Sequence, residues 1–238
     1  MARAMTPLDP STPAAEALAR IAAADPARPF VVAQLGQSLD GRIATVNGES
    51  LYINGEEGLD HLHRLRAMVD AVVVGAGTIS ADNPHLTVRR VSGRSPARVV
   101  VDPRGRLGHE GRWLADDGVR RLVVSAAPVS AAPGVETIVL PARAGRIAPP
   151  DIVAALAAHG LRRILVEGGA TTISSFIDAG AVDRLHILFG CTIIGSGRPG
   201  LELRPIERLA DARRPATEIY KLGRCDVLFD CGLRDEGR

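Results

Sequence analysis

The sequence is poor in aromatic residues and carries almost no excess charge. Only 3% of its 238 residues are Phe, Trp or Tyr, and the formal net charge is +2. Neither base-stacking platforms nor a basic stripe is therefore expected, which argues against nucleic-acid binding. No apolar run approaches the ~20 residues of a membrane helix, and the N-terminal segment is too rich in Ala and Pro for a secretory signal. We therefore expect a cytoplasmic protein with no nucleic-acid or membrane partner.

Cysteine is also scarce. The chain contains only Cys191, Cys225 and Cys231, and no two of them have the spacing of a CxxC metal or redox motif. An odd number of cysteines without that spacing argues against a disulfide framework and against a zinc site. We therefore expect three reduced thiols in the core and no metal centre.

What the sequence does contain is enough apolar material for one folded domain. Hydrophobic residues make up 46% of the chain, and its length is typical of a single large domain. We place this domain at residues 29–232, between an N-terminal extension (1–28) and a short tail (233–238). The extension is expected to be partly disordered or to form a short helix over 14–24, between two prolines. Nothing in it indicates a contribution to the core.

Short apolar segments alternate with helical patterns along this domain. Most of these segments lack polar alternation, which is typical of strands covered on both faces of a sheet. Helices between strands favour right-handed crossovers and parallel pairing. The predicted fold class is α/β, with one mixed, mostly parallel sheet and helices on both faces. The predicted strands are 30–35, 70–75, 97–102, 120–125, 136–140, 162–167 and 183–190, and the predicted helices lie within 55–69, 150–160 and 171–180.

The C-terminal part of the domain has a different pattern. Two alternating segments, TEIYKLG and CDVLFDC, meet at Gly223 and Arg224. A short turn between two alternating segments indicates an antiparallel hairpin, which we expect to close the sheet.

Three glycine-containing loops follow predicted strands, and each could face a ligand. In LVEGGATTISSF (165–176), Glu167 and two glycines stand between a strand and a helix, whose first N–H groups could bind a phosphate. A second loop lies within 72–89, and a third, at 36–53, surrounds the short segment RIATV. A tight turn, a capped helical turn and a plain hairpin would explain the three loops without a ligand. Glu167 could likewise cap backbone amides rather than face a ligand.

The order of these motifs resembles a known family. The runs SLDGRIA, GES, LRAMVDAVVVGAGTISADNPHLTVR, VVVDPRGRL and LVEGGATTISSF are together similar to the C-terminal reductase domain of RibD, from bacterial riboflavin biosynthesis. The resemblance implies a dihydrofolate-reductase-like fold and NADPH as hydride donor. It also implies reduction of the ribose of 5-amino-6-(5-phosphoribosylamino)uracil to a ribityl chain. The zinc deaminase of bifunctional members carries H-x-E and P-C-x-x-C motifs, and neither occurs here. We therefore expect a free-standing reductase, with any deamination supplied by a separate chain.

The resemblance also implies roles for individual residues. Hydride transfer to C1′ of the ribose would depend mainly on placing cofactor and substrate together, with Asp82 and Glu167 as candidate catalytic acids. The implied arginines could bind the substrate phosphate, and the helix start after Gly169 could hold the cofactor pyrophosphate. The implied substrate-binding residues are Ser50, Arg66, Leu86, Arg89 and Glu167. The implied cofactor-binding residues are Gly36, Tyr52, Thr78, Asp82, Gly168, Gly169, Ala170, Thr171, Thr172, Ile173, Ser174 and Ser175.

The chain departs from the family at several of its positions. Gln34 stands where bifunctional relatives often carry a lysine, and Tyr52 stands where they carry a tryptophan. Asp102 and Pro103 occupy a turn where some relatives place a hydroxyl. These differences bear on the substrate contact and on recognition of the cofactor's 2′-phosphate.

Other functions are consistent with the same residues. A reductase of this fold could act on the undeaminated diaminopyrimidine or on a pterin such as dihydrofolate. A non-catalytic subunit could bind NADPH beside a separate deaminase, whereas a structural dimer module would bind no cofactor. The resemblance implies a homodimer, to which the apolar segment 183–195 could contribute, although packing within the sheet explains that segment equally well.

Overall fold

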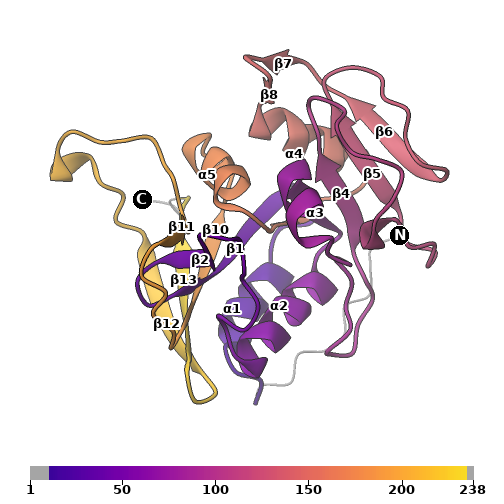
Figure 1. The fold of residues 1–238 in the computed structure, drawn as a ribbon. Coiled ribbons are helices and arrows are strands. Elements are labelled where there is room, and N and C mark those ends of the chain that lie inside the picture. The colour runs from indigo at the N-terminus through magenta and orange to yellow at the C-terminus, as the bar shows by residue number, and fades with distance from the viewer. Residues whose placement is uncertain (1–10, 235–238) are drawn as a thin grey trace.

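The computed structural model describes residues 11–234 of the chain, and a nine-stranded sheet forms its centre. The sheet strands are β1 (Phe30–Ser38), β3 (Ala71–Gly75), β4 (Ala97–Val101), β5 (Arg121–Ser125), β6 (Val135–Val139), β9 (Arg163–Val166), β10 (Arg184–Gly190), β12 (Ala216–Leu222) and β13 (Asp226–Gly232). Their order is β12-β13-β10-β1-β9-β3-β4-β5-β6 (Figure 1). The strands from β10 to β6 are parallel, and β12 and β13 form an antiparallel hairpin. The predicted mixed sheet and its C-terminal hairpin are therefore confirmed.

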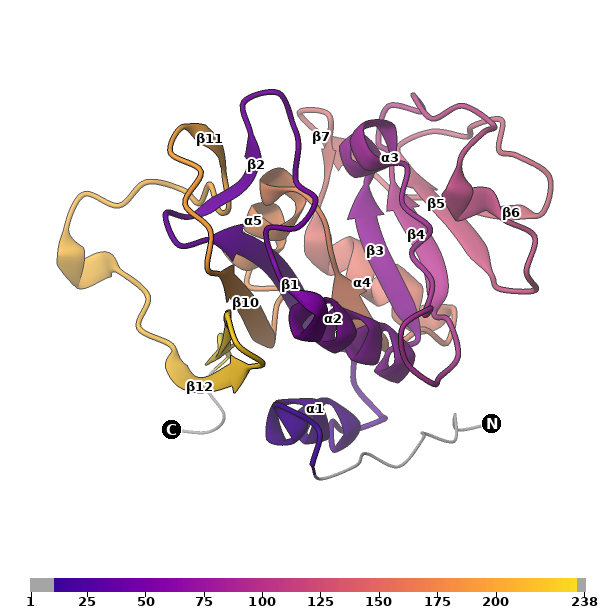
Figure 2. The same ribbon diagram turned by 60° about the horizontal axis from the view of Figure 1, so that its bottom comes forward.

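Helices cover both faces of the sheet (Figures 1 and 2). They are α1 (Ala15–Ala22), α2 (Glu56–Met68), α3 (Ala76–Asp82), α4 (Pro149–Ala158) and α5 (Ala170–Asp178), with short 3-10 turns at Arg112–Leu114 and Leu209–Asp211. Neighbouring residues of β1 face opposite layers: Phe30 and Val32 pack with α1 and α2, whereas Val31 and Ala33 pack in the cluster that contains α4 and α5. Burial on both sides is the physical reason why these strands show no polar alternation.

The segment around RIATV pairs differently from the plain hairpin considered above. Strand β2 (Arg42–Thr45) pairs antiparallel with β11 (Gly197–Pro199), a segment about 150 residues later in the chain, in a separate two-stranded sheet. Another two-stranded ribbon joins β7 (Ala142–Arg143) to β8 (Arg146–Ile147). The plain-hairpin interpretation of 36–53 is therefore wrong, and both ribbons lie beside the main sheet (Figure 2).

The N-terminal extension contributes to the core, contrary to expectation. The predicted short helix is present as α1, and Leu18 and Ile21 are fully buried against Phe30 and Leu65. Arg20 of this helix also donates a 3.0 Å hydrogen bond from Nη1 to a carboxylate oxygen of Asp230 in β13. The helix is thus fastened to the sheet by packing and by charge, whereas residues 1–10 and 235–238 lie outside the described region.

Leu18→Ala should therefore lower the free energy of unfolding by about 2–5 kcal/mol, because it removes a fully buried side chain from a packed layer. Urea denaturation of the full chain measures this change. Leu51→Ala is the matched control, since Leu51 is 76% exposed and should change stability by less than about 0.5 kcal/mol. Equal midpoints for the two variants would show that α1 does not stabilise the domain.

The cysteines are distributed differently from the prediction. Cys231 is buried, but Cys191 and Cys225 are exposed, so the expectation of three core thiols is wrong for two of them. All three are free thiols. Within the described residues, no group of His, Cys, Asp and Glu side chains is arranged to hold a metal ion. None of the described helices has the length and apolar character needed to cross a bilayer.

Candidate active site

A pocket of about 1080 Å³ lies along the carboxyl edge of the parallel strands. Gly36 of β1, Gly75 of β3, Val101 of β4 and Glu167, which follows β9, all line it. In Figure 2 the carboxyl ends of β3 and β4 point towards α3 and the β7–β8 ribbon. Ligands of open parallel sheets commonly bind at this edge, because strand ends and helix N-termini converge there.

The start of α5 forms one wall of this pocket. Gly168 has φ +103°, a backbone conformation that favours glycine, and this turn aims the first amides of α5 into the pocket. The N–H of Gly169, the residue before the helix, donates a 3.2 Å hydrogen bond to Oγ1 of Thr78. Thr78 belongs to α3, which follows β3. The two glycine loops predicted to face a ligand are therefore joined into a single wall.

A buried ion pair forms the floor. Arg66 of α2 donates from Nε and Nη2 to the two carboxylate oxygens of Glu167, at 2.8 and 2.6 Å, and from Nη1 to the carbonyl of Thr87 at 3.1 Å. Both side chains are 7% exposed. Burial lowers the pKa of Arg66, but the charge and hydrogen bonds of Glu167 raise it further, so the net pKa lies above its usual value. Every guanidinium nitrogen of Arg66 thus has a protein acceptor, which suits holding Glu167 better than gripping a phosphate.

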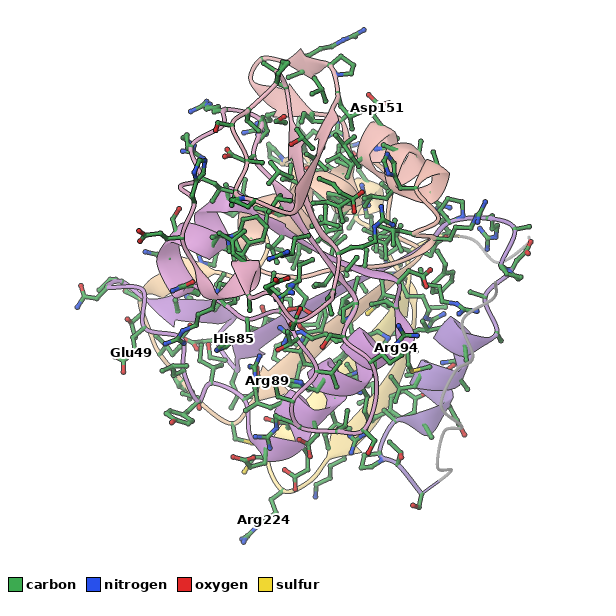
Figure 3. The ribbon with its side chains drawn as sticks, turned by 90° about the vertical axis from the view of Figure 1, so that its right-hand side faces the viewer. Glu49, His85, Arg89, Arg94, Asp151 and Arg224 are labelled. Atoms are coloured by element: carbon green, nitrogen blue, oxygen red, sulfur yellow. The ribbon has the colours of Figure 1, made fainter. Side chains whose placement is uncertain are left out.

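The segment that carries Leu86 and Arg89 is held in place by a histidine. The backbone N–H of Arg89 donates a 2.9 Å hydrogen bond to Nδ1 of His63, a residue of α2 that is 4% exposed. Leu86 is buried and lines the pocket with a φ of +58°. Arg89 itself lies outside the pocket lining, and its Nη1 donates to Oγ1 of Thr87 at 2.9 Å. Figure 3 shows Arg89 and His85 on the same side of the molecule.

The first half of the site is built around β1. Gly36 and Ser50 line the pocket, and a side chain at Gly36 would collide with Asn54, whose Nδ2 donates to the Leu188 carbonyl at 3.3 Å. Tyr52 is 86% exposed, with a φ of +66°, and does not line the pocket. Tyr52 therefore lies neither in the core nor in the lining of the pocket.

Asp82 lies at the mouth of the pocket, at the end of α3. Partial burial raises the pKa of its carboxyl, and the positive charge of Arg198 acts in the opposite direction. The net shift is upward, so this carboxyl keeps its proton to a higher pH than an ordinary aspartic acid does. Arg198 comes from β11, and its guanidinium also lies close to Gly48.

The structure brings most of the predicted site residues together. Those that line the pocket are Gly36, Ser50, Arg66, Thr78, Asp82, Leu86, Glu167, Gly168, Gly169, Thr171, Thr172 and Ser175. Those that do not are Tyr52, Arg89, Ala170, Ile173 and Ser174. Ile173 is fully buried in the core, and the Ser174 hydroxyl accepts a 2.8 Å hydrogen bond from the N–H of Glu202.

The sequence interpretation missed four arginines that line the pocket: Arg106, Arg143, Arg146 and Arg198. Two of them lie in RAGR, a turn signal flanked by like charges directly after a predicted strand. That pattern was a usable signal, because a short turn at the carboxyl end of a strand lies at the ligand edge of a parallel sheet. Arg198 carried no such signal, since β11 contains Gly and Pro and does not read as a strand.

The state of His63 makes stability depend on pH. Burial first, and then the charges of Arg66, Arg89 and Arg90, lower the pKa of His63 to about 4. The unfolded chain therefore binds a proton that the folded chain does not between pH 6.5 and about 4, so stability is lost as the pH falls through this window. His63→Asn keeps an acceptor for the Arg89 N–H but does not titrate. Between pH 6.5 and 4.5, the free energy of unfolding of this variant should fall by roughly 1 kcal/mol less per pH unit than that of the wild type. Urea denaturation at several pH values measures both slopes. Identical slopes for the two proteins would contradict the role assigned to His63.

Comparison with known proteins agrees with this geometry. The model of the RibD C-terminal domain matches residues 29–221. The chain belongs to the RibD C-terminal domain family. It is 36% identical over 207 residues to the 2,5-diamino-6-ribosylamino-4(3H)-pyrimidinone 5′-phosphate reductase of Methanothermobacter thermautotrophicus. This alignment covers 82% of the present chain and 94% of that protein. The protein of the same name from Archaeoglobus fulgidus is 38% identical over 181 residues, or 71% of this chain and 83% of its own length.

Solved structures of this family share the fold. The deaminase and 5-amino-6-(5-phosphoribosylamino)uracil reductase of Thermotoga maritima superposes with a TM-score of 0.76 at 27% identity, over 87% of this chain and 57% of that one. The riboflavin biosynthesis reductase of Saccharomyces cerevisiae gives 0.71 at 25% identity, over 86% and 90% of the two chains. The predicted dihydrofolate-reductase-like fold and family are thereby confirmed. As a member of this RibD family, the chain is an oxidoreductase of riboflavin biosynthesis, and a nicotinamide cofactor fits that reductase family.

Proposed function

We propose that this protein transfers a hydride from NADPH to the ribose of a 6-ribosylaminopyrimidine 5′-phosphate, which becomes a ribityl chain. The observation that carries the proposal is the single pocket in which the α5 start and Thr78 form one wall and the Arg66–Glu167 pair forms the floor. One part of this pocket offers backbone N–H groups to a pyrophosphate, and another offers a fixed carboxylate to a polar ring.

The residues present fit a dinucleotide. Gly168 and Gly169 leave the backbone at the α5 start bare, and Thr171 and Thr172 add hydroxyls that line the same wall. A volume of about 1080 Å³ accommodates a cofactor together with a substrate. When bound, the nicotinamide supplies the hydride, and the protein's task is to hold C1′ of the ribose against it.

The Arg66–Glu167 pair would orient the pyrimidine base. The two bonds from Arg66 hold the Glu167 carboxylate in one orientation, and each carboxylate oxygen has a further lone pair for an N–H of the base. A hydrogen-bond acceptor that is already fixed costs little reorganisation when the substrate binds.

Asp82 is the better of the two candidate proton donors. Its raised pKa leaves more of the acid form near neutral pH than an ordinary aspartate has, and a donor must carry a proton when the substrate arrives. Both carboxylate oxygens of Glu167 already accept hydrogen bonds from Arg66, which suits this side chain to holding the base. We assign proton delivery to Asp82, directly or through a water, and ring recognition to Glu167.

The pyrimidine base of the substrate could be either of two, because the relatives are named for different compounds. The archaeal proteins, which match this chain over most of their length, are named for the 2,5-diamino compound. The Thermotoga enzyme is named for the deaminated uracil compound that the sequence resemblance implied. We expect the diamino compound to be the better substrate, since the chain resembles the separate reductases over nearly their whole length.

The test measures NADPH oxidation by absorbance. The purified protein is mixed separately with the diamino compound, with the deaminated uracil compound and with dihydrofolate. Oxidation with one or both ribosylaminopyrimidine phosphates supports the proposal, and the ratio of kcat/KM identifies the base. Oxidation of NADPH with dihydrofolate and with neither pyrimidine would indicate that the substrate is a pterin. NADPH binding without any oxidation would favour a non-catalytic subunit beside a separate deaminase.

We also propose a homodimer. The segment between β11 and β12 extends away from the sheet (Figure 1), and Leu203, Ile206 and Leu209 along it are exposed. The apolar strand β10, considered for the interface above, lies inside the sheet between β1 and β13. Sedimentation velocity would report the dimer, and a monomer at micromolar concentration would contradict it.

A further inference from the structure

Two of the three cysteines lie opposite each other at the end of the antiparallel β10–β13 pair. The last rung of this ladder pairs Phe189 with Val227. Antiparallel strands run in opposite directions, so a step forward along one strand is a step back along the other. Two steps beyond the last rung, Cys191 therefore stands opposite Cys225, although the two are 34 residues apart in the chain.

The two thiols are in direct contact. The Cys191 S–H donates a 2.7 Å hydrogen bond to the backbone carbonyl of Cys225. Desolvation of the thiol, followed by a hydrogen bond with the Cys225 side chain and its charge, raises the pKa of Cys191. The carboxylate of Asp226 acts in the same direction, whereas Lys221 acts in the opposite one. The side chains of the two cysteines therefore face each other, and both are exposed to solvent.

This geometry suits a covalent bond between the two sulfur atoms. Directly opposite residues of an antiparallel pair have Cα atoms about 4.5 or 5.5 Å apart, and disulfides join Cα atoms about 4.4–6.8 Å apart. The third cysteine differs, since Cys231 is buried and its ladder partners are Leu185 and Thr217. Only the exposed pair thus combines access from solvent with a second thiol in reach.

The backbone beside each cysteine is held in place by another part of the domain. Asp226, next to one cysteine, accepts a 2.8 Å hydrogen bond from the N–H of Gly55, the residue before α2. Thr192, next to the other, accepts a 2.8 Å hydrogen bond at its carbonyl from the N–H of Leu39, the residue after β1. A bond between the thiols would therefore join two segments that the fold already holds side by side.

A bond at this position would close a large loop of the chain. The loop contains β11, whose Arg198 lines the pocket, and the exposed segment between β11 and β12 that extends away from the sheet (Figure 1). Figure 3 shows Arg224, the residue before the second cysteine, pointing away from the body of the molecule. A disulfide stabilises a protein chiefly by restricting the unfolded chain, and it does so more for longer loops.

We propose that Cys191 and Cys225 form a reversible disulfide under oxidising conditions and that this bond stabilises the domain. The oxidant is a low-molecular-weight disulfide. One thiolate of the pair attacks it, forms a mixed disulfide and releases one small thiol; the other cysteine then attacks the mixed disulfide and releases the second small thiol. The protein loses two protons and two electrons, and the oxidant gains them. No substrate or cofactor takes part, so the inference does not depend on the proposed function.

The test exposes the reduced full chain to oxidised glutathione. Because the pKa of Cys191 is raised, the reaction is run at about pH 8.5, where more thiolate is present. Thiol titration in denaturant should show a fall from three free thiols to one, and peptide mapping should join Cys191 to Cys225 within one chain. The melting temperature should rise by roughly 5–15 °C and return to its starting value after reduction with dithiothreitol.

Two variants serve as controls. Cys191→Ser should carry glutathione on Cys225 and show no rise in melting temperature after oxidation. Cys231→Ala should still form the bond and show the same rise as the wild type, since Cys231 takes no part in it.

Three results would overturn the inference. Glutathione on both exposed cysteines without a bond between them would show that the thiols cannot meet. A disulfide between two chains would show that their partners lie on another molecule. A bond within the chain that leaves the melting temperature unchanged or lowers it would show that the folded domain does not accommodate the bond without strain.

Discussion

Glu167→Gln is expected to lower kcat/KM with the ribosylaminopyrimidine by about 10²–10³-fold, because it removes the charge that compensates Arg66 on the pocket floor. The amide keeps the shape of the carboxylate but can accept from Arg66 through only one oxygen. The guanidinium, which is 7% exposed, then lacks one of its partners in a buried site, and the base loses its fixed acceptor. Steady-state kinetics measure the loss, and the Kd of NADPH should change far less than kcat/KM.

The chain offers a close control for this substitution. Glu136 also accepts two hydrogen bonds from one arginine, Arg120, at 2.8 and 2.7 Å, but both partners are more than 40% exposed. Water screens such a pair, so Glu136→Gln should change stability by less than about 1 kcal/mol and leave the kinetics as they are. A wild-type kcat/KM for Glu167→Gln would show that Glu167 has no role in substrate binding or turnover.

Gly168→Ala should weaken NADPH binding by about tenfold or more and lower the free energy of unfolding by about 1–3 kcal/mol. A φ of +103° is strained for alanine, and the added Cβ would lie 2.7 Å from Oγ1 of Thr78. Relief of that contact moves Thr78 away from the Gly169 N–H, which opens the wall at the α5 start. Fluorescence titration with NADPH measures the binding, and urea denaturation measures the stability.

A second glycine separates backbone strain from the contact with Thr78. Gly180 also has a positive φ, of +65°, but a Cβ there would meet nothing within 4 Å. Gly180→Ala should therefore cost about 1 kcal/mol of stability and leave the Kd of NADPH unchanged. If both alanine variants bound NADPH equally well, the α5 start would not be the cofactor wall.

The interpretation of the site depends on the burial of its charges. Arg66 and Arg89 were equivalent in the sequence, since each is an arginine implied at the substrate phosphate. In the structure Arg66 is buried with all its nitrogens bonded, whereas Arg89 is exposed beside the pocket. We therefore propose that the phosphate-binding role implied for both is better suited to Arg89, and that Arg66 positions Glu167.

The sequence alone determined the strands of the main sheet, the crossovers and the glycine loops. Buried parallel strands such as VVV at 72–74 consist of consecutive apolar residues, because both faces of the sheet are covered. The turn at Gly168 is equally visible, since a backbone with positive φ next to a helix start selects glycine. These signals are local, and each can be read within a few residues.

Only the tertiary structure decided the contacts between distant segments. Glu167 meets Arg66 across 101 residues, and β2 pairs with a three-residue strand that contains Gly and Pro. The local sequence around Leu18 would be the same if α1 were an isolated helix on the surface, but in the structure Leu18 packs against β1 and α2. Burial and pairing of this kind depend on which surfaces meet after the chain has folded, and the local sequence carries no record of the partner.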